Sequence, residues 1–377
     1  MLQDARVTGM RITKPRRCRQ ASLVLIVFLI TINLINLFIL TRCTSSLGQS
    51  SNENTNIRSV LAGNTESVDY AGDQKLALQR GRTQDGAAWI PKIVHLTWKN
   101  TVIPGSTANW VKKWTKTNPG YEVWFWTDDD ARNFIRKHYS YFFTKFQKYP
   151  TAIFRADAIR YFILYHFGGI YADLDIEPLK SLDPIRQKYA CVIATEPNEH
   201  AEIAWNFREG EKLACNAFMA CRPHHPFLRL LIDMLDMQGI KESNVVVATG
   251  PVMLTRTLKI YNNINKLMTH DQNSTNAVFL APSNYFIPRI DQQVIDGLLP
   301  HCGEPNLNQK YSKFCEIFNR GDFHNGPTRE SFTDHHWWHS WFIKLKKSKP
   351  KSIAAVIPYV TLARTLFESD SVEKKTY

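Results

Sequence analysis

The stretch from Phe154 to Asp183 most constrains this chain, because it joins a helical pattern, two glycines and a short strand. Apolar residues recur at spacings of three and four in its first half, which predicts a helix. We expect the helix to end at Gly168-Gly169, since a residue that tolerates the left-handed conformation suits a helix C-terminus. The apolar segment 170–172 then predicts a strand that leads directly into Asp173 and Asp175.

The spacing of these two aspartates indicates a site for a divalent cation. In an extended segment residues two apart point to the same side, so Asp173 and Asp175 can face one ligand while Leu174 packs inward. Two carboxylates at the end of a buried strand repel each other unless a cation lies between them. Hard oxygen ligands of this kind suit Mg²⁺ or Mn²⁺. The alternative is a surface turn or a helix cap, for which D-x-D is also common.

Other segments of the chain complete an α/β pattern. Asp128, Asp129 and Asp130 stand between a strand-like and a helical segment, and we interpret them as helix caps rather than as a metal site. His95 lies in the first predicted strand, where we interpret it as a core residue. The alternation of strands and helices indicates a parallel α/β sheet. The strands are predicted at 93–98, 121–126 and 190–195, and the helices at 109–117 and 226–237.

The pattern R-x-D-x-x-R-x-x-x-L-x-x-x-G-G-x-Y-x-D-x-D runs without a gap from Arg155 to Asp175. It resembles the sugar-binding region of glycosyltransferase family 32, which includes the yeast initiating α-1,6-mannosyltransferase and the inositol phosphoceramide mannosyltransferases. Weaker matches extend from Ile93 to Trp341. The resemblance implies a GT-A fold, which is an α/β, Rossmann-like nucleotide-diphospho-sugar transferase domain. It also implies a divalent metal, Mn²⁺ or Mg²⁺, that bridges the diphosphate of the donor.

The resemblance assigns roles to residues of this motif. Asp173 and Asp175 would hold the metal. Asp157 and Arg160 are one helical turn apart on one face, and would bind the sugar hydroxyls and the ribose. We count these four residues as catalytic and Tyr171 as substrate-binding. For Asp157 and Arg160 the alternative is a surface ion pair worth a few tenths of a kcal/mol.

Three further assignments lie outside the motif and also depend on the resemblance. Trp98, near the end of the first strand, would stack on the base of the nucleotide. Asn216 would lie on the acceptor side of the sugar, with a buried structural amide as its alternative. His336 corresponds to a late histidine that completes the metal or pyrophosphate site, and neutral imidazole suits either. His335 and His339, in the same segment DHHWWHSW, are its rivals.

The N-terminus predicts a membrane anchor. Residues 21–40 contain no charged side chain, and a run of this length crosses a bilayer as one helix. Residues 1–20 carry six basic side chains against one acidic one, and positive residues stay on the cytoplasmic side. The sequence therefore predicts a cytoplasmic tail (1–20), a transmembrane signal-anchor (21–40) and single-pass type II topology. With the family resemblance, this implies a Golgi membrane protein whose catalytic domain is lumenal.

The remaining boundaries follow from composition. Residues 41–88 are rich in small polar residues and predict a flexible stem, and the GT-A domain is expected at 89–343. Residues 344–377 start with a basic run and continue with a broken apolar stretch, which we interpret as a membrane-interfacial tail. The net charge of +13 is not interpreted as nucleic-acid binding, because a lumenal domain does not meet nucleic acid.

Cysteine and sequon positions agree with a lumenal location. Cys302 and Cys315 bracket a loop rich in Pro and Asn, and are a candidate disulfide in an oxidising compartment. The sequence has no C-x-x-C pair and no ligand spacing typical of zinc. Asn273 begins an N-S-T sequon, and is the predicted glycosylation site.

These expectations together describe a type II membrane glycosyltransferase. The resemblance implies transfer of a hexose, with GDP-mannose as the first choice of donor, to a glycan or glycolipid acceptor with retention of configuration. A UDP-galactose, UDP-glucose or UDP-N-acetylglucosamine transferase of the same fold is the first alternative. A nucleotide-sugar hydrolase and an inactive lumenal glycan-binding partner are the others.

Overall fold

The computed structural model describes residues 89–238, 244–268, 275–304, 309–321, 324–338 and 348–368 of the 377-residue chain. All of them belong to one structural unit, Glu66–Tyr377. The predicted cytoplasmic tail, signal-anchor and stem, and the sequon at Asn273, lie outside the described residues. Among the helices that are described, none combines the length and the apolar character needed to cross a bilayer.

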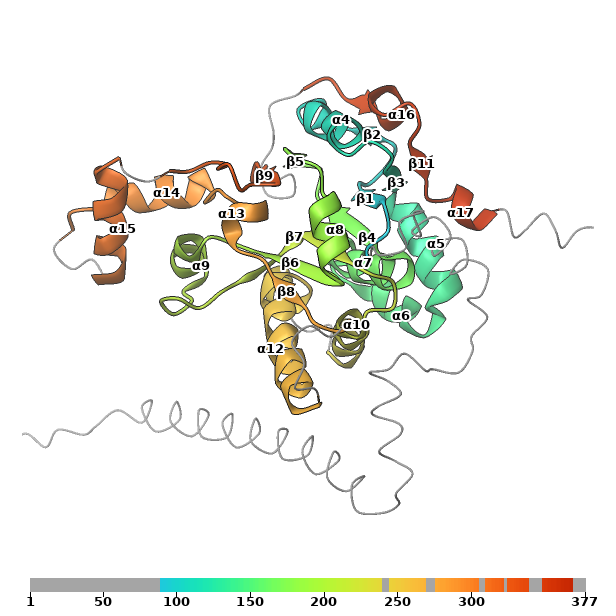
Figure 1. The fold of residues 1–377 in the computed structure, drawn as a ribbon, viewed down its shortest axis with the longest axis horizontal. Helices are drawn as coiled ribbons and strands as arrows, with labels where there is room; N and C mark the ends of the chain where they lie inside the picture. The colour runs from blue at the N-terminus through green and yellow to red at the C-terminus, as the bar shows by residue number, and fades with distance from the viewer. Residues whose placement is uncertain are drawn as a thin grey trace, which may run out of the picture. The chain divides into compact units, whose positions relative to one another are not determined.

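A seven-stranded mixed sheet forms the centre of the domain, with helices on both faces (Figure 1). In spatial order its strands are β11 (Thr361–Leu362), β3 (Glu122–Trp126), β1 (Ile93–Thr97), β4 (Gly169–Ala172), β7 (Ala214–Cys221), β6 (Cys191–Thr195) and β8 (Phe279–Leu280). Two small antiparallel pairs accompany it, β10 (Lys351–Ser352) with β2 (Val102–Ile103) and β5 (Ile176–Pro178) with β9 (Thr333–His335).

The helices follow the strands in the alternation expected of an α/β domain. They are α4 (Ala108–Thr117), α5 (Asp128–His138), α6 (Ser140–Lys148), α7 (Ala152–Phe167), α8 (Asp183–Lys188), α9 (Asn198–Trp205), α10 (Pro226–Met237), α11 (Val245–Ala248), α12 (Pro251–Met268), α13 (Ser283–Phe286), α14 (Gln292–Leu298), the 3₁₀ turn η1 (Leu299–His301), α15 (Gln309–Asn319), α16 (Ile353–Val356) and α17 (Thr365–Glu368).

The sheet is mixed rather than wholly parallel, which corrects the sequence prediction. β1, β3, β4 and β11 run parallel to one another, whereas β7 is antiparallel to both β4 and β6. The chain leaves β6 at the carboxyl edge of the sheet and enters β7 from the same edge through α9. Since β6 and β4 run the same way, the segments that follow β4 and β6 and the start of β7 all lie at one edge.

The C-terminal segment belongs to the domain, so the boundary predicted at residue 343 is too early. β10 pairs with β2, and β11 pairs with β3 at the edge of the main sheet. The apolar side chains that suggested a membrane-interfacial tail are buried in the core, among them Ile353, Val356 and Ile357. Apolar residues alone could not distinguish packing on a membrane from packing on the protein, because both remove the same surface from water.

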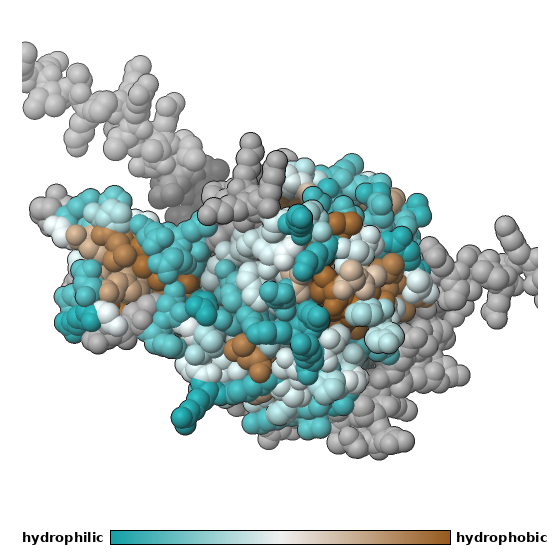
Figure 2. All heavy atoms as spheres, turned by 90° about the horizontal axis from the view of Figure 1, so that it is seen from above, coloured by the Kyte–Doolittle hydropathy of each residue, from teal (hydrophilic) through white to brown (hydrophobic). Residues whose placement is uncertain are grey.

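Two disulfide bonds link segments of the described chain. Cys302 and Cys315 are bonded, which confirms the predicted pair and links η1 to α15. A second bond joins Cys191 and Cys221 across the β6–β7 pair, and was not predicted. A small apolar cluster lies between α14 and α15, apart from the main core, and Figure 2 shows apolar side chains at the left of the molecule in this part.

Candidate functional site: a carboxylate and arginine cluster at the carboxyl edge of the sheet

The junction of α7 and β4 positions the D-x-D segment. α7 ends at Gly168, which has φ of +65° and whose N–H donates to the Leu164 carbonyl. A Cβ at Gly168 would lie 2.5 Å from Pro223 Cδ, and one at Gly169 (φ +97°) would lie 2.7 Å from the Ile93 carbonyl oxygen. The predicted glycine turn is therefore confirmed, and it requires glycine both for conformation and for space.

His95 fixes this junction from the neighbouring strand. Its Nε2 is 2.8 Å from the Gly168 carbonyl oxygen, and its Nδ1 accepts from Trp126 Nε1 at 3.2 Å. Since a carbonyl only accepts, Nε2 carries the proton and the ring is neutral. Burial among aromatic rings lowers the pKa of His95 to about 3. The prediction that His95 is a core residue is confirmed.

Arg160 is the centre of the polar network behind Asp173. Its Nη2 lies 2.8 Å from Asp157 Oδ1, and its Nη1 donates to the Asn216 carbonyl at 2.6 Å. Nη1 also lies 3.6 Å from Asp173 Oδ1, and the guanidinium is 4.6 Å above the ring of Tyr171. Arg160 and Asp157 are both buried, so the alternative of a surface ion pair is wrong.

Asp157 is held by three different side chains. Besides Arg160, Asn216 Nδ2 donates to its Oδ1 at 3.0 Å and Thr249 Oγ1 donates to its Oδ2 at 3.2 Å. Burial outweighs these stabilising contacts and raises the pKa of Asp157 to about 6. Asn216 Nδ2 also donates to Tyr161 Oη at 3.3 Å, so the residue is a buried, hydrogen-bonded amide that also lines the cavity.

Asp173 and Asp175 have different surroundings although one residue separates them. Asp173 Oδ1 accepts from Tyr171 Oη at 2.7 Å, and burial, opposed by Arg160, raises the pKa of Asp173. Asp175 Oδ2 accepts from the Trp338 N–H at 2.8 Å and lies 3.4 Å from His335 Nε2. Burial favours the protonated form of Asp175, but His335 and the hydrogen bonds outweigh it and hold its pKa at about 2.

The donor set fits a hard divalent cation. Among the described residues, the ion pairs and side-chain hydrogen bonds of Asp173 use Oδ1, and those that Asp175 makes to other residues use Oδ2. Each carboxylate therefore has a second oxygen that can bind a cation. Their mutual repulsion, which contributes to the raised pKa of Asp173, is what a bound Mn²⁺ or Mg²⁺ would relieve.

A cavity of about 540 Å³ lies at this edge of the sheet. Such a volume is in the range of small-molecule sites. The cavity is lined by all the predicted site residues of the described chain except His336, namely Trp98, Asp157, Arg160, Tyr171, Asp173, Asp175 and Asn216.

Trp98 and the acids after β3 lie at the same edge of the sheet. The Trp98 N–H donates to the Trp126 carbonyl at 3.0 Å, so the ends of β1 and β3 are adjacent. Within the described part of the chain, the Trp98 Nε1 has no hydrogen-bond partner. Thr127 and Asp130 form a capping box at the start of α5, which confirms that this acidic run caps a helix. Asp128 nevertheless lines the cavity.

Comparison with known proteins identifies the region that contains Asp157, Arg160, Asp173 and Asp175. Residues 104–192 match the family model of the glycosyltransferase sugar-binding region containing a DXD motif. This part of the chain is similar to the DXD sugar-binding region of glycosyltransferases. This confirms the resemblance inferred from Arg155 to Asp175. That Asp173 and Asp175 are the DXD pair of this region stays a prediction.

Several of the similar curated proteins are fungal. The chain is 36% identical over 173 residues to inositol phosphoceramide mannosyltransferase 3 of Schizosaccharomyces pombe, which is 45% of each chain. It is 34% identical over 176 residues to mannosyl phosphorylinositol ceramide synthase CSH1 of Saccharomyces cerevisiae, or 46% of this chain and 43% of that one. The initiation-specific α-1,6-mannosyltransferase of the same yeast is 33% identical over 107 residues, 26% of this chain and 22% of that one. The matched regions thus span 45% and 43% of the first two of these relatives, and 22% of the third.

Similar solved structures are also named as glycosyltransferases. The chain matches the PaToxG glycosyltransferase with a TM-score of 0.32 and 15% identity, over 66% of this chain and 95% of that one. The glycosyltransferase GlyE of Streptococcus pneumoniae TIGR4 matches with a TM-score of 0.32 and 10% identity, over 76% of this chain and 64% of that one. The GT-A class stays a prediction.

His336 does not lie in the DXD site. Its Nε2 is 2.7 Å from Glu177 Oε2, and its ring stacks on Trp110 with 4.1 Å between centroids. His335, its rival, lines the cavity beside Asp175. Consecutive residues of the extended β9 segment point to opposite sides, so only one of the two histidines can face the carboxylates. The geometry therefore favours His335, whereas His339 lies outside the described residues.

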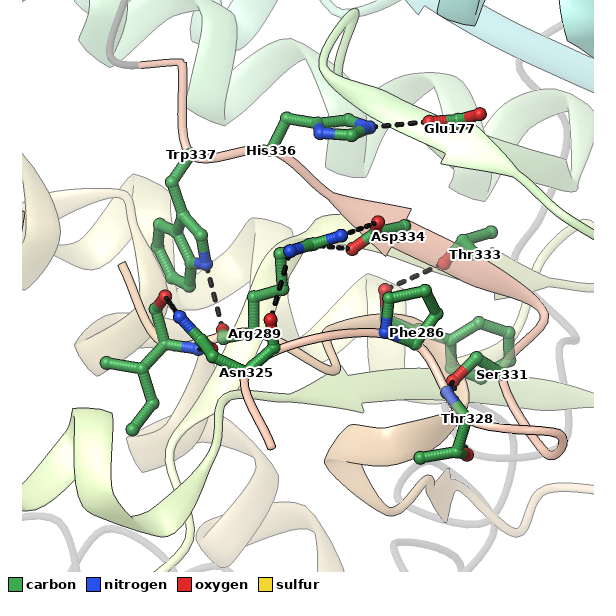
Figure 3. A network of polar contacts seen from close by, with 12 residues as sticks. Glu177, Phe286, Arg289, Asn325, Thr328, Ser331, Thr333, Asp334, His336 and Trp337 are labelled. Carbon is green, nitrogen blue, oxygen red and sulfur yellow. Dashed lines mark hydrogen bonds and ion pairs between the residues drawn. The ribbon is translucent and has the colours of Figure 1, made fainter. Parts of the chain in front are cut away.

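The polar groups around His336 form an ion-pair network rather than a metal site. Glu177, Asp334 and His336 offer ligand atoms within 4.8 Å of one another. However, Arg289 binds both oxygens of Asp334 at 2.7 and 2.8 Å, and Lys113 pairs with Glu177. Figure 3 shows the Arg289–Asp334 pair beside the His336–Glu177 contact. Because each carboxylate already has a cationic partner, a further cation would gain little there.

Sequence reasoning missed several residues that line the cavity, among them Glu196, His200, Trp205, Trp337 and Trp338. Glu196 directly follows β6, just as Asp173 follows β4. A polar residue after a predicted buried strand was therefore the signal that could have found it. The tryptophans gave no such signal, because Trp337 faces the cavity through a positive φ of 47° that the sequence does not reveal.

Proposed function

We propose that this protein transfers a hexose from a nucleotide sugar to an acceptor hydroxyl, with mannose from GDP-mannose as the first choice. The observation that carries the proposal is the DXD pair, which lies in one cavity with the Asp157–Arg160–Asn216 network. The similar fungal proteins are named as mannosyltransferases, which supports mannose and a glycan or glycolipid acceptor. Membrane attachment in the Golgi with a lumenal active site is part of the proposal, based on residues 1–40.

The site residues would have different roles, which depend on their positions in the cavity. Asp173 and Asp175 would hold Mn²⁺ or Mg²⁺, and the metal when bound offsets negative charge on the diphosphate leaving group. Arg160 stays charged and keeps Asp157, the Asn216 carbonyl and Asp173 in one arrangement, so that sugar hydroxyls meet oriented partners. Trp98 would receive the base at the other end of the cavity. Retention of configuration follows from the resemblance alone.

The proposal is tested by a donor screen on the full chain in detergent. Release of GDP or UDP is followed for a panel of nucleotide sugars, with Mn²⁺ or with EDTA. We expect one donor, GDP-mannose first, to be turned over only when metal is present. Turnover of a UDP sugar instead of GDP-mannose would identify that UDP sugar as the donor. No turnover and no binding of any donor by a folded sample would refute the enzyme and favour an inactive partner.

Substitution of the DXD pair tests the metal role. Asp173→Asn and Asp175→Asn keep the shape of each side chain but remove its negative charge. We expect each variant to lose nearly all transfer, by a factor of roughly a hundred or more, while thermal melting stays close to that of the wild type. Full activity in either variant would refute the proposed metal site.

A further inference from the structure

A carboxylate–imidazole pair lies at the carboxyl edge of the sheet, on the far side of β7 from the DXD segment. Glu196 follows β6, and His200 lies in the first turn of α9. His200 Nδ1 is 2.6 Å from Glu196 Oε2, and both side chains are buried and line the cavity. The proposed function assigns no role to this pair.

The Glu196 carboxylate fixes which ring nitrogen of His200 is available. An ionised carboxylate only accepts hydrogen bonds, so Nδ1 of His200 carries a proton and donates it to Glu196. In a neutral imidazole, Nε2 is then an acceptor. With the ring neutral, Nε2 is an acceptor atom in a fixed orientation, which suits the hydroxyl proton of a ligand in the cavity.

An aromatic ring lies beside the imidazole of His200, and a second one lines the same cavity. The ring of Trp337 lies 4.4 Å from that of His200 between centroids, and 4.3 Å from that of His335. Trp337 Nε1 donates to the Arg289 carbonyl at 2.9 Å, which holds the indole in place, as Figure 3 shows. Trp205 ends α9, also lines the cavity and is partly exposed at 37%. Aromatic faces beside hydrogen-bonding groups suit a ring that has both apolar faces and hydroxyl groups.

The order of the strands places the pair beyond the donor. Along the edge, β1 contributes Trp98, β4 leads to the DXD pair, β7 contributes Asn216, and β6 leads to Glu196. A donor whose base is at Trp98 and whose diphosphate is at the DXD pair has its sugar near Asn216. β6 is two strands from β4, about 10 Å. In a transferase, the molecule that binds on the side of the sugar away from the diphosphate is the acceptor.

We propose that Glu196 and His200 form the binding site for the acceptor, whose polyhydroxylated six-membered ring donates a hydroxyl hydrogen bond to His200 Nε2. Trp205 and Trp337 provide the aromatic surfaces for this ring. Glu196 is the positioning residue that fixes the tautomer of His200. The inference rests on the proposed function, because only a transferase has an acceptor. Binding of a polyol ring at Glu196 and His200, however, can be measured without any turnover.

The test compares two variants with a matched control. His200→Asn keeps a donor to Glu196 but removes the atom at the Nε2 position, whereas His200→Gln places an amide oxygen near that position. His301→Asn is the control, because His301 makes the same contact to Glu304, at 2.7 Å, on the surface outside the cavity. Methyl α-D-mannoside and myo-inositol serve as acceptor probes, with the donor found in the screen, on the full chain in detergent.

We expect His200→Asn to raise the KM for the acceptor probe at least tenfold and to change the donor KM by less than twofold. His200→Gln should recover part of the loss, and His301→Asn should match the wild type. Glu196→Gln should also raise the acceptor KM, because the ring is then free to take the other tautomer. An unchanged acceptor KM in His200→Asn, or an equal rise in both KM values, would overturn the proposal.

Direct binding of the probes separates this inference from the proposed function. Saturation-transfer NMR on the full chain reports binding of the mannoside or the inositol without any donor. A signal that is present in the wild type and lost in His200→Asn supports the site even if no donor is turned over, in which case only the proposed function fails. No signal with either probe in the wild type overturns the site even if a donor is hydrolysed.

Discussion

Protonation of His95 should make the fold sensitive to acid, and the structure gives the size of the effect. The pKa of His95 is lowered from 6.5 to about 3, because its ring is buried. In the unfolded chain the same ring binds a proton below pH 6.5. Stability is therefore fully present above pH 6.5, and it is lost as the pH falls from 6.5 toward 3. At pH 5 the loss from His95 alone is about 2 kcal/mol.

The structure explains why protonation of His95 is unfavourable in the folded protein. A proton on His95 Nδ1 would face the N–H of Trp126, which now donates to that atom. The Nε2 side is already occupied by the bond to the Gly168 carbonyl. An acid-induced loss of this contact would disturb the turn that leads into the DXD strand, so activity should fall together with stability.

The assay is urea unfolding of the full chain between pH 8 and pH 5, followed by tryptophan fluorescence. His95→Gln should be less stable at pH 8 by about 1–3 kcal/mol, since Trp126 Nε1 loses its acceptor. Between pH 8 and pH 5, however, the variant should lose about 2 kcal/mol less than the wild type. Other buried histidines, such as His166, contribute equally to both proteins and cancel in the difference.

An exposed histidine provides the control for this measurement. His301→Gln removes an imidazole at the surface, and so controls for the loss of a histidine that is not buried. If His95→Gln and the wild type lose the same free energy of unfolding between pH 8 and pH 5, the argument from burial is wrong.

Two further substitutions test how the site is built. Arg160→Gln leaves Asp157 buried without its cation and should lower the free energy of unfolding by about 3–5 kcal/mol, and a melting temperature equal to the wild type would contradict the ion-pair account. Gly168→Ala places a Cβ against Pro223 at positive φ and should cost about 2–5 kcal/mol in chemical denaturation. Gly120→Ala, at φ of +80° with open space around it, should cost only about 1–2 kcal/mol, so equal losses would show that the contact with Pro223 is unimportant.

The local pattern of the central stretch was enough to predict its structure. The helix, the glycine turn and the strand that delivers Asp173 and Asp175 all appear where the spacing placed them. These features depend on short-range rules, namely periodicity, positive φ at glycine and alternation along a strand. The same rules identified Asp130 as part of a helix cap.

Contacts between distant segments were not predictable in this way. His335 and His336 are equivalent in the sequence, and only the pairing of β9 with β5 decides that His335 faces Asp175. Likewise, the apolar residues near Ile353 suited a membrane surface until β10 and β11 placed them in the core.

The sequence by itself therefore determined the DXD carboxylates, the helix that carries Asp157 and Arg160, and the glycine turn between them. Only the tertiary structure decided which histidine faces the site, and that Glu196 and His200 line the same cavity as Asp173 and Asp175. The physical reason is that side-chain direction along one element follows from local backbone geometry. Which elements meet at the edge of a sheet depends on strand order, and strand order is set by packing of the whole chain.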